Sequence, residues 1–441
     1  MADLDRLPTT LLDLLANTLV LRQLSPYIPS KSLLALSATC KDIQDIIISQ
    51  SEPWRHLDLT GITSAMIDSS PIDSGGISWR AERMDEALTE DDFYSGPLRG
   101  IFGRLHQQRL LRNVRTLVLD GLSVPADIVR EIVSEDRYNV RILSIRESKH
   151  LNQTKLQQVL RYITRPTRAE GTPKLKALYF FGPRNTVRAN SGQQYGLPLS
   201  GRHGVLGSEG AQIGAEWNRR SSSTLQTYIS DDESRWYGST GRVMKRPLSD
   251  WPETLHACRD LVAFDAVLCR GIRHNITKVS SESFLQPAIA TVALGRGCEV
   301  CSRSPEGPSI FGTTPSHTLP LLSPVPLHSS TLRAAQISHP TGTRPPHLYA
   351  RCEDCLRGRW CERCNRWWCE DCYDDPVSKL HLRTEMQQLE LREQLEREEI
   401  TGPSWGTSAT TSSVKVYSKL CVEHCLVSEM MSGAGSNGMW G

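Results

Sequence analysis

A short phrase of apolar residues recurs along the first two thirds of the chain. It reads VRTLVL at 114–119, VRILSI at 140–145 and LKALYF at 175–180, with weaker copies at 54–59 (WRHLDL) and 258–263 (CRDLVA). Between the clear copies, residues 125–134 and 154–163 space their apolar side chains at the helical period. The pattern predicts strands that alternate with helices, each strand stacking its apolar edge on the next.

This alternation resembles the units of leucine-rich-repeat proteins. The alternative interpretation is an ordinary α/β domain with parallel strands, but the phrase itself recurs and no Rossmann-type glycine motif follows any of its copies. The consensus asparagine of the repeat is absent, so we expect a short, irregular leucine-rich-repeat α/β array. We place the array at residues 95–182 and its end at 251–295, with a flexible insertion at 183–250.

Residues 7–60 precede the repeats and are rich in leucine, with breaks that divide them into short helices. The segment contains a Leu-Pro pair at 7–8, a Ser-Leu-Leu-Ala-Leu-Ser centre at 32–37, a Cys-Lys pair at 40–41 and a tryptophan at 54. In these features it resembles an F-box, with the first F-box helix aligned to Thr18–Ser25. We therefore expect a three-helix F-box at the N-terminus.

Taken together, these two regions resemble F-box/leucine-rich-repeat proteins of the type abundant in filamentous fungi, including variants with a cysteine-rich tail. The resemblance implies a non-catalytic, substrate-recognition subunit of a Skp–cullin–F-box ubiquitin ligase. The F-box would dock on a Skp-type adaptor, and through it on a cullin, while the repeats, the cysteine-rich module or both hold a protein substrate. The adaptor-binding residues implied are Leu19, Leu21, Leu24, Ile28, Pro29, Leu33, Leu34, Leu36 and Ile43.

The cysteines are concentrated at the other end of the chain. Of 13 in total, ten lie after residue 297, almost all in close pairs, whereas Cys40, Cys258 and Cys269 are scattered. A gap of two residues lets one tight turn direct two thiolates at the same tetrahedral ion, so the pairs predict zinc rather than disulfides. The expected ligands are Cys298, Cys301, Cys352, Cys355, Cys361, Cys364, Cys369, Cys372, Cys421, His424 and Cys425.

These ligands would fill two structural zinc sites, or three if His381 also takes part. We expect interleaved pairing, the first pair with the third and the second with the fourth. The pattern loosely resembles cross-brace modules such as RING and FYVE fingers, although the spacing departs from both. The small module would span 296–425, with a disordered Pro- and Ser-rich loop at 302–346 and a charged helix at 381–400.

Three isolated tryptophans, Trp217, Trp236 and Trp251, lie in or beside the insertion, and we expect them to fold back onto the domain rather than anchor a partner. The fold class predicted for the whole chain is α+β and multidomain, with long disordered loops.

Charge and motifs narrow the function classes. The net charge is only +2 and no basic run follows an aromatic cluster, which argues against a nucleic-acid partner. No apolar stretch suits a signal peptide or a membrane span, so we expect no membrane contact and a cytoplasmic or nuclear location, or both. The common catalytic motifs are absent, and we expect no enzyme activity. Two alternatives remain: a stand-alone, zinc-dependent ligase of RING-like type, and a non-catalytic interaction scaffold.

Overall fold

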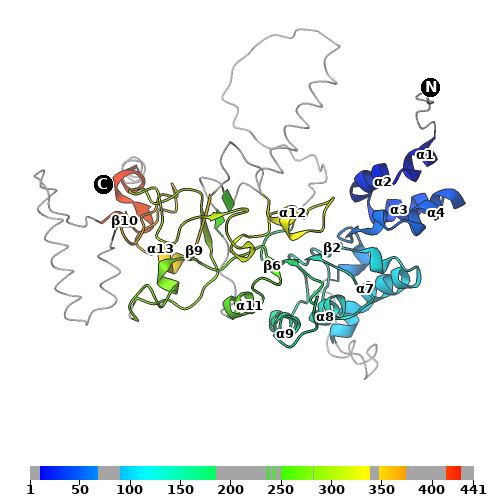
Figure 1. The fold of residues 1–441 in the computed structure, drawn as a ribbon, viewed down its shortest axis with the longest axis horizontal. Coiled ribbons are helices and arrows are strands. Elements are labelled where there is room, and N and C mark those ends of the chain that lie inside the picture. Colours follow the sequence, from blue (N-terminus) through cyan, green and yellow to red (C-terminus); the bar gives the residue numbers. More distant parts are fainter. Residues whose placement is uncertain are drawn as a thin grey trace, which may run out of the picture.

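The computed structural model describes residues 10–67, 90–184, 236–237, 242–243, 250–281, 283–337, 347–373 and 414–428. These residues form an α+β structure in which short N-terminal helices lie at one end and the cysteine-rich region at the other (Figure 1). Leu7-Pro8, Trp217 and the predicted helix at 381–400 lie outside the described residues, as does most of the predicted insertion at 183–250.

Four short helices, not three, form the N-terminal unit. They are α1 (Leu11–Ala16), α2 (Thr18–Leu24), α3 (Ser30–Ser37) and α4 (Lys41–Ser49), with single turns η1 (Ser25–Tyr27) and η2 (Glu52–Trp54). Asn17 causes the extra division. Its backbone is extended and its side chain accepts the amide of Leu19 at 3.0 Å, so one helix ends there and another begins.

The recurring phrases form a parallel sheet. Its strands are β1 (His56–Asp58), β2 (Thr116–Val118), β3 (Ile142–Ser144), β4 (Ala177–Tyr179) and β6 (Ala263–Phe264), which pair in chain order. One buried row, built from the same position of each phrase, runs across the sheet in register through Leu57, Leu117, Leu143, Leu178 and Phe264. The predicted stacking of parallel strands is therefore confirmed.

Three expected boundaries of the array are wrong. The sheet begins with β1, inside the segment assigned to the F-box, rather than at residue 95. The fifth phrase is 261–266 rather than 258–263, because Cys258 caps the preceding helix and Phe264 takes the position of Leu178. The array also ends before residue 295, since β7 (Val292–Leu294) belongs to a second sheet.

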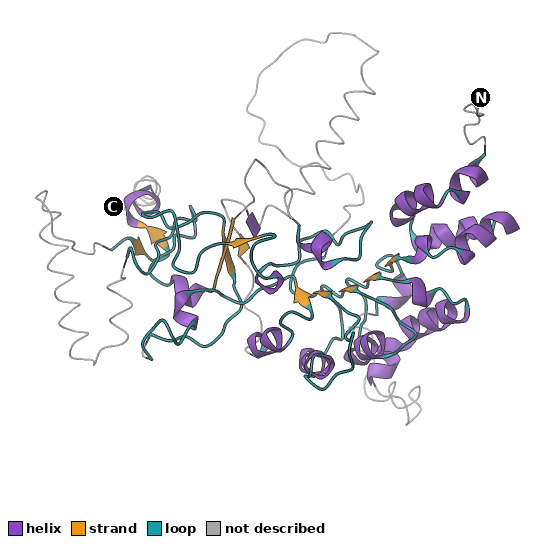
Figure 2. Ribbon diagram, in the orientation of Figure 1, coloured by secondary structure: helices purple, strands orange, loops and turns teal. Residues whose placement is uncertain are grey.

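Helices cover one face of the parallel sheet (Figure 2). They are α7 (Glu90–Gln107), α8 (Ala126–Ser134), α9 (Gln153–Ile163) and α11 (Trp251–Ala257). Each of α8 and α9 turns an apolar stripe inward, and Asn152 caps α9 by accepting the amide of Lys155 at 3.0 Å. Trp251 and Trp236 are both buried, as expected of tryptophans that fold back onto the domain.

The second sheet is antiparallel and joins the array to the cysteine-rich region. Its order is β5 (Arg242–Val243), β7, β9 (His347–Arg351) and β8 (Ser309–Ile310). The short helix α13 (Glu353–Leu356) follows β9, and a hairpin of β10 (Val416–Tyr417) and β11 (Leu420–Cys421) precedes the turn η7 (Val422–Leu426).

The loop at 302–346 is not disordered in its described part, residues 302–337. It contains β8, the turn η6 (Ser316–Thr318), the helix α12 (Leu332–Gln336) and, between the last two, an irregular segment that we call the strap, residues 319–330. Proline and serine content predicted disorder, but the strap also carries buried apolar side chains, those of Leu319, Leu321, Leu322 and Val325. Burial of Leu321 and Val325 against the parallel sheet holds the segment in place.

We predict that Leu178→Ala destabilises the protein by about 2–5 kcal/mol, because this leucine is fully buried in the row that joins the strands. Thermal or denaturant unfolding measures the loss. The matched control is Leu19→Ala, the same chemical change at a side chain that is 71% exposed, and it should leave stability nearly unchanged. Equal losses for the two variants would contradict the proposed core.

Candidate functional site

Three groups of four side chains could each hold a metal ion, because the ligand atoms of each group lie within 4.8 Å of one another. We name them by position. The junction group is Cys269, His274, Cys352 and Cys355; the central group is Cys298, Cys301, Cys369 and Cys372; the distal group is Cys361, Cys364, Cys421 and Cys425.

The sulfur spacing fits a tetrahedral ion. A tetrahedron with zinc–sulfur bonds of about 2.3 Å has an edge of about 3.8 Å, whereas the sulfurs of a disulfide lie about 2 Å apart. One sulfur pair in each group, Cys269–Cys355, Cys301–Cys369 and Cys364–Cys421, is separated by 3.7 Å. All thirteen cysteines are unbridged. The arrangement therefore suits tetrahedral thiolate coordination, as in structural zinc sites.

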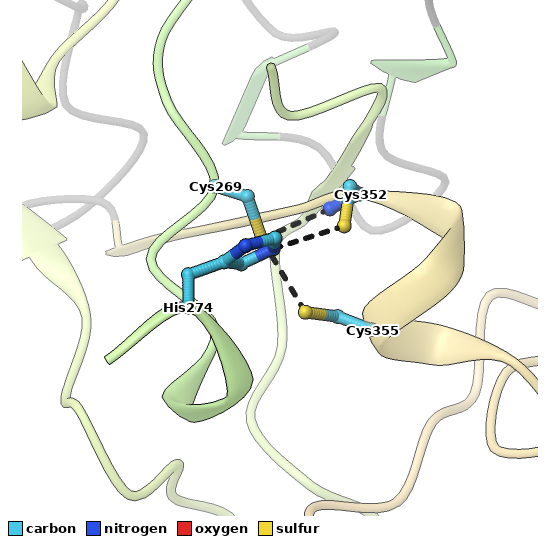
Figure 3. A group of neighbouring side chains, drawn as sticks. All are labelled: Cys269, His274, Cys352 and Cys355. Carbon is cyan, nitrogen blue, oxygen red and sulfur yellow. Dashed lines mark hydrogen bonds between the residues drawn. The ribbon is translucent and has the colours of Figure 1, made fainter. Parts of the chain in front are cut away.

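The junction group draws its ligands from two regions of the chain (Figure 3). Cys269 and His274 follow the last strand of the parallel sheet, while Cys352 and Cys355 belong to the start of α13. His274 Nδ1 lies 3.1 Å from the carbonyl of Leu285, and Nε2 lies 3.2 Å from Cys352 Sγ. In the tautomer with the proton on Nδ1, the Nδ1–H group donates to that carbonyl and Nε2 is available as a ligand. A hydrogen bond of this kind is the usual support for a metal-binding histidine.

Backbone amides converge on the junction sulfurs. Cys269 Sγ accepts the amides of Cys352 at 3.1 Å and of Gly271 at 3.4 Å, and such bonds favour a thiolate. Position 271 must be a glycine for Cys355 Sγ to lie so close to the backbone there, because a Cβ would be only 2.6 Å from that sulfur.

The central and distal groups share one turn geometry. In each, the first Cys-x-x-Cys pair is followed by a residue in the left-handed region, Ser302 at φ 54° and Asn365 at φ 57°, whose amide returns to the carbonyl of the first cysteine. The turn therefore points both sulfurs of a pair to the same side. In the central group Cys298 Sγ also accepts the amide of Cys369 at 3.3 Å.

The Cys361 thiol of the distal group differs from an ordinary buried cysteine. Burial raises the pKa of Cys361, but the backbone amides of Cys364 and Cys421 outweigh it and lower that pKa to about 7. Burial raises the pKa of Cys258 to about 12, and this cysteine belongs to none of the three groups and lies in the main core.

Three tryptophans form the core around the central and distal groups. Trp360, Trp367 and Trp368 are all buried, and the first two also donate from Nε1, to Asn365 Oδ1 at 2.8 Å and to the carbonyl of Arg296 at 2.7 Å. The tryptophans thus pack inside the module and hold the loops that carry the ligands.

The expected pairing of ligands is wrong, although its interleaved order is right. The pair at 298 and 301 meets the pair at 369 and 372, and the pair at 361 and 364 meets that at 421 and 425. These four pairs interleave along the chain. The pair at 352 and 355 stands apart, because β9 lies beside β7 and brings it to Cys269 and His274.

Two ligand candidates escaped the sequence analysis and one was misassigned. Cys269 is one of the scattered cysteines and His274 lies outside the cysteine pairs; their only sequence signal is a cysteine and a histidine separated by four residues. His424 does not belong to any of the three groups, and the neighbouring cysteines at 421 and 425 supply the ligands there. His381 lies outside the described residues.

The nine residues implied for adaptor contact divide by exposure. Leu21, Leu33 and Ile43 are buried, and Ile43 belongs to the main core that includes the parallel sheet; Ile28 and Leu36 are half-buried. Leu19, Leu24, Pro29 and Leu34 are exposed. Two further exposed apolar side chains, Leu11 and Tyr27, were not among the expected contacts.

Comparison with known proteins does not assign this chain to a family. The scan against family models and the searches of curated proteins and solved structures found no match to this chain. Among the described residues, no helix combines the length and the apolar content needed to cross a bilayer.

We predict that the purified protein carries about three zinc ions, one for each group. Elemental analysis of Cys355→Ser, Cys301→Ser and Cys364→Ser should each show the loss of one equivalent, since a missing thiolate breaks one tetrahedral set. The controls are Cys40→Ser and His424→Ala, which should retain the full content. Loss of metal from His424→Ala would contradict the ligand sets described above.

We predict that Gly271→Ala weakens the junction site alone, because its methyl group collides with Cys355 Sγ. The metal affinity of that one site should fall by about 10–100-fold, as for other changes in the support of metal ligands. Competition with a chromophoric chelator measures it. Gly61→Ala is the control, since a Cβ there meets nothing within 4 Å. A uniform loss from all sites would speak against a local effect.

Proposed function

We propose that this protein is the substrate-recognition subunit of a Skp–cullin–F-box ubiquitin ligase. The observation that supports this best is the apolar surface left uncovered on the N-terminal helices. Leu19 is 71% exposed, Tyr27 67% and Leu34 45%. Large exposed apolar side chains gathered on one short unit are typical of a surface that binds another protein.

The N-terminal unit packs on the parallel sheet through side chains other than these exposed ones. Ile43 and Ile47 of α4 and the indole of Trp54 join the main core, and Trp54 Nε1 donates to the carbonyl of Ile47 at 2.8 Å. Ser30 Oγ also donates to the carbonyl of Asp58 in β1 at 2.9 Å. Because these contacts already attach the helices to the sheet, the exposed leucines are free for an adaptor.

The proposed role is positional rather than catalytic. The adaptor would bind at the N-terminal end and the substrate farther along the chain, so a separate conjugating enzyme meets the substrate at raised effective concentration. Zinc, the ion that thiolate-rich tetrahedral sets favour, would supply cross-links that replace a hydrophobic core. Each group offers four protein ligands, which leaves no position for a reactive water.

We predict that Leu19→Glu with Leu34→Glu weakens binding to a Skp-type adaptor at least about tenfold, because a charge would be buried at the interface. Pull-down with purified adaptor and cullin measures it. Tyr162→Glu, at an exposed aromatic on α9 (61% exposed), is the matched control and should bind normally.

Adaptor binding that survives the double substitution would count against the receptor role. The same samples test one alternative, because the interleaved order of the central and distal pairs is that of cross-brace modules, including RING fingers. Autoubiquitination by the full chain with activating and conjugating enzymes, in the absence of adaptor, would favour a RING-like ligase instead.

A further inference from the structure

The strap lies along the face of the parallel sheet opposite the helices. It contacts the strands in reverse order. The amide of Leu321 donates to Phe264 O of β6, Tyr179 Oη of β4 donates to Leu322 O, both at 2.8 Å, and Ser330 Oγ lies 2.9 Å from Thr116 Oγ1 of β2. Near its far end the ring of His328 packs on Tyr27 with centroids 5.4 Å apart. The strap therefore crosses the sheet from its last strand to the N-terminal helices.

The strap binds this face mainly through apolar side chains. Leu321 and Val325 are buried in one cluster with residues of four strands, namely Val118, Ile142, Ala177, Tyr179 and Ala263. Residues 319–330 contain no Asp, Glu, Lys or Arg, and include three prolines. The face thus accepts an uncharged segment, and prolines suit it because they have no backbone amide that needs a hydrogen-bond acceptor.

One buried arginine, Arg146, forms a hydrogen bond to a polar side chain of the strap. Arg146 is 1% exposed and pairs with Asp120 at 2.7 Å, while Ser144 Oγ donates to the same carboxylate at 2.6 Å. The guanidinium Nη1 donates both to the carbonyl of Pro183 at 3.1 Å and to Ser323 Oγ of the strap at 2.8 Å. A buried guanidinium is best satisfied when each of its donors has an acceptor. An occupant that offers a hydroxyl or carbonyl oxygen at the position of Ser323 keeps the second of these bonds.

The two ends of the loop that contains the strap are held by contacts that do not involve residues 319–330. The loop that contains it leaves the central group at Cys301 and returns to the junction group at Cys352, and β8 pairs with β9 between these points. Backbone bonds from the strap amides are few, those of Leu319 to Ser316 O, of Leu321 to Phe264 O and of Leu322 to Ala335 O. The segment can therefore leave the sheet without opening either metal group.

We propose that this face of the sheet is a peptide-binding groove, that residues 319–330 are its intramolecular occupant, and that a partner with an uncharged Leu-, Val- and Pro-rich segment bearing a serine displaces them. The partner's role as a ligase substrate rests on the proposed function, whereas the groove itself does not. A tethered occupant competes at an effective concentration in the millimolar range. A free segment consequently binds the intact chain far more weakly than it binds an open groove.

The test uses a labelled synthetic peptide with the sequence of residues 316–331 and fluorescence anisotropy. In the full chain, Leu321→Asp with Val325→Asp should open the groove and tighten binding of this peptide at least about tenfold. A peptide that carries the same two aspartates should not bind. The control variant, Thr313→Asp with Ser316→Asp, adds equal charge at exposed positions of the same loop and should behave as the unaltered chain.

Hydrogen exchange on the unaltered chain gives a second measurement, which does not depend on the variant. Saturating peptide should speed exchange of the Leu321 and Leu322 amides, while the Ile145 amide, bonded to Tyr179 O within the sheet, stays protected. Two results would overturn the proposal: a folded variant that binds the peptide no better, or strap amides that exchange only together with Ile145. Adaptor pull-down is unaffected by either result, so the two proposals fail separately.

Discussion

The C-terminal half of this protein depends on bringing sulfur atoms from distant parts of the chain to within 3.7 Å of one another. Thiolates at that distance repel unless a cation lies between them, so a metal ion is the natural complement of each group. The four ligands of the junction group come from two distant parts of the chain, since two follow the last strand of the parallel sheet and two follow β9. An ion there would join the parallel sheet to the cysteine-rich region.

The parallel sheet and the cysteine-rich region are stabilised by different interactions. The parallel sheet is stabilised by a fully apolar row of side chains from Leu57 to Phe264. The cysteine-rich region has short strands and long loops, and its buried residues are chiefly cysteine and tryptophan. Its loop between Cys301 and Cys352 then returns to cover the array, which makes the two halves interdependent.

Local patterns could be predicted from the sequence, whereas meetings between distant segments could not. The strand phrases and the Cys-x-x-Cys turns are local, and both were visible. The role of Cys269 and His274 depends on where β9 pairs, which no spacing reveals. The strap was missed because proline content suggested disorder while Leu321 and Val325 supplied the burial. Exposure of Leu19 beside a buried Leu21 likewise depends on packing.

X-ray absorption at the zinc edge tests the central claim most directly. The junction group provides three sulfur ligands and the nitrogen of His274, and the central and distal groups provide four sulfur ligands each. The predicted spectrum is a first shell dominated by sulfur at about 2.3 Å with a minor nitrogen contribution. A shell dominated by nitrogen or oxygen would contradict closed thiolate sites, and with them the account of how this half of the protein is held together.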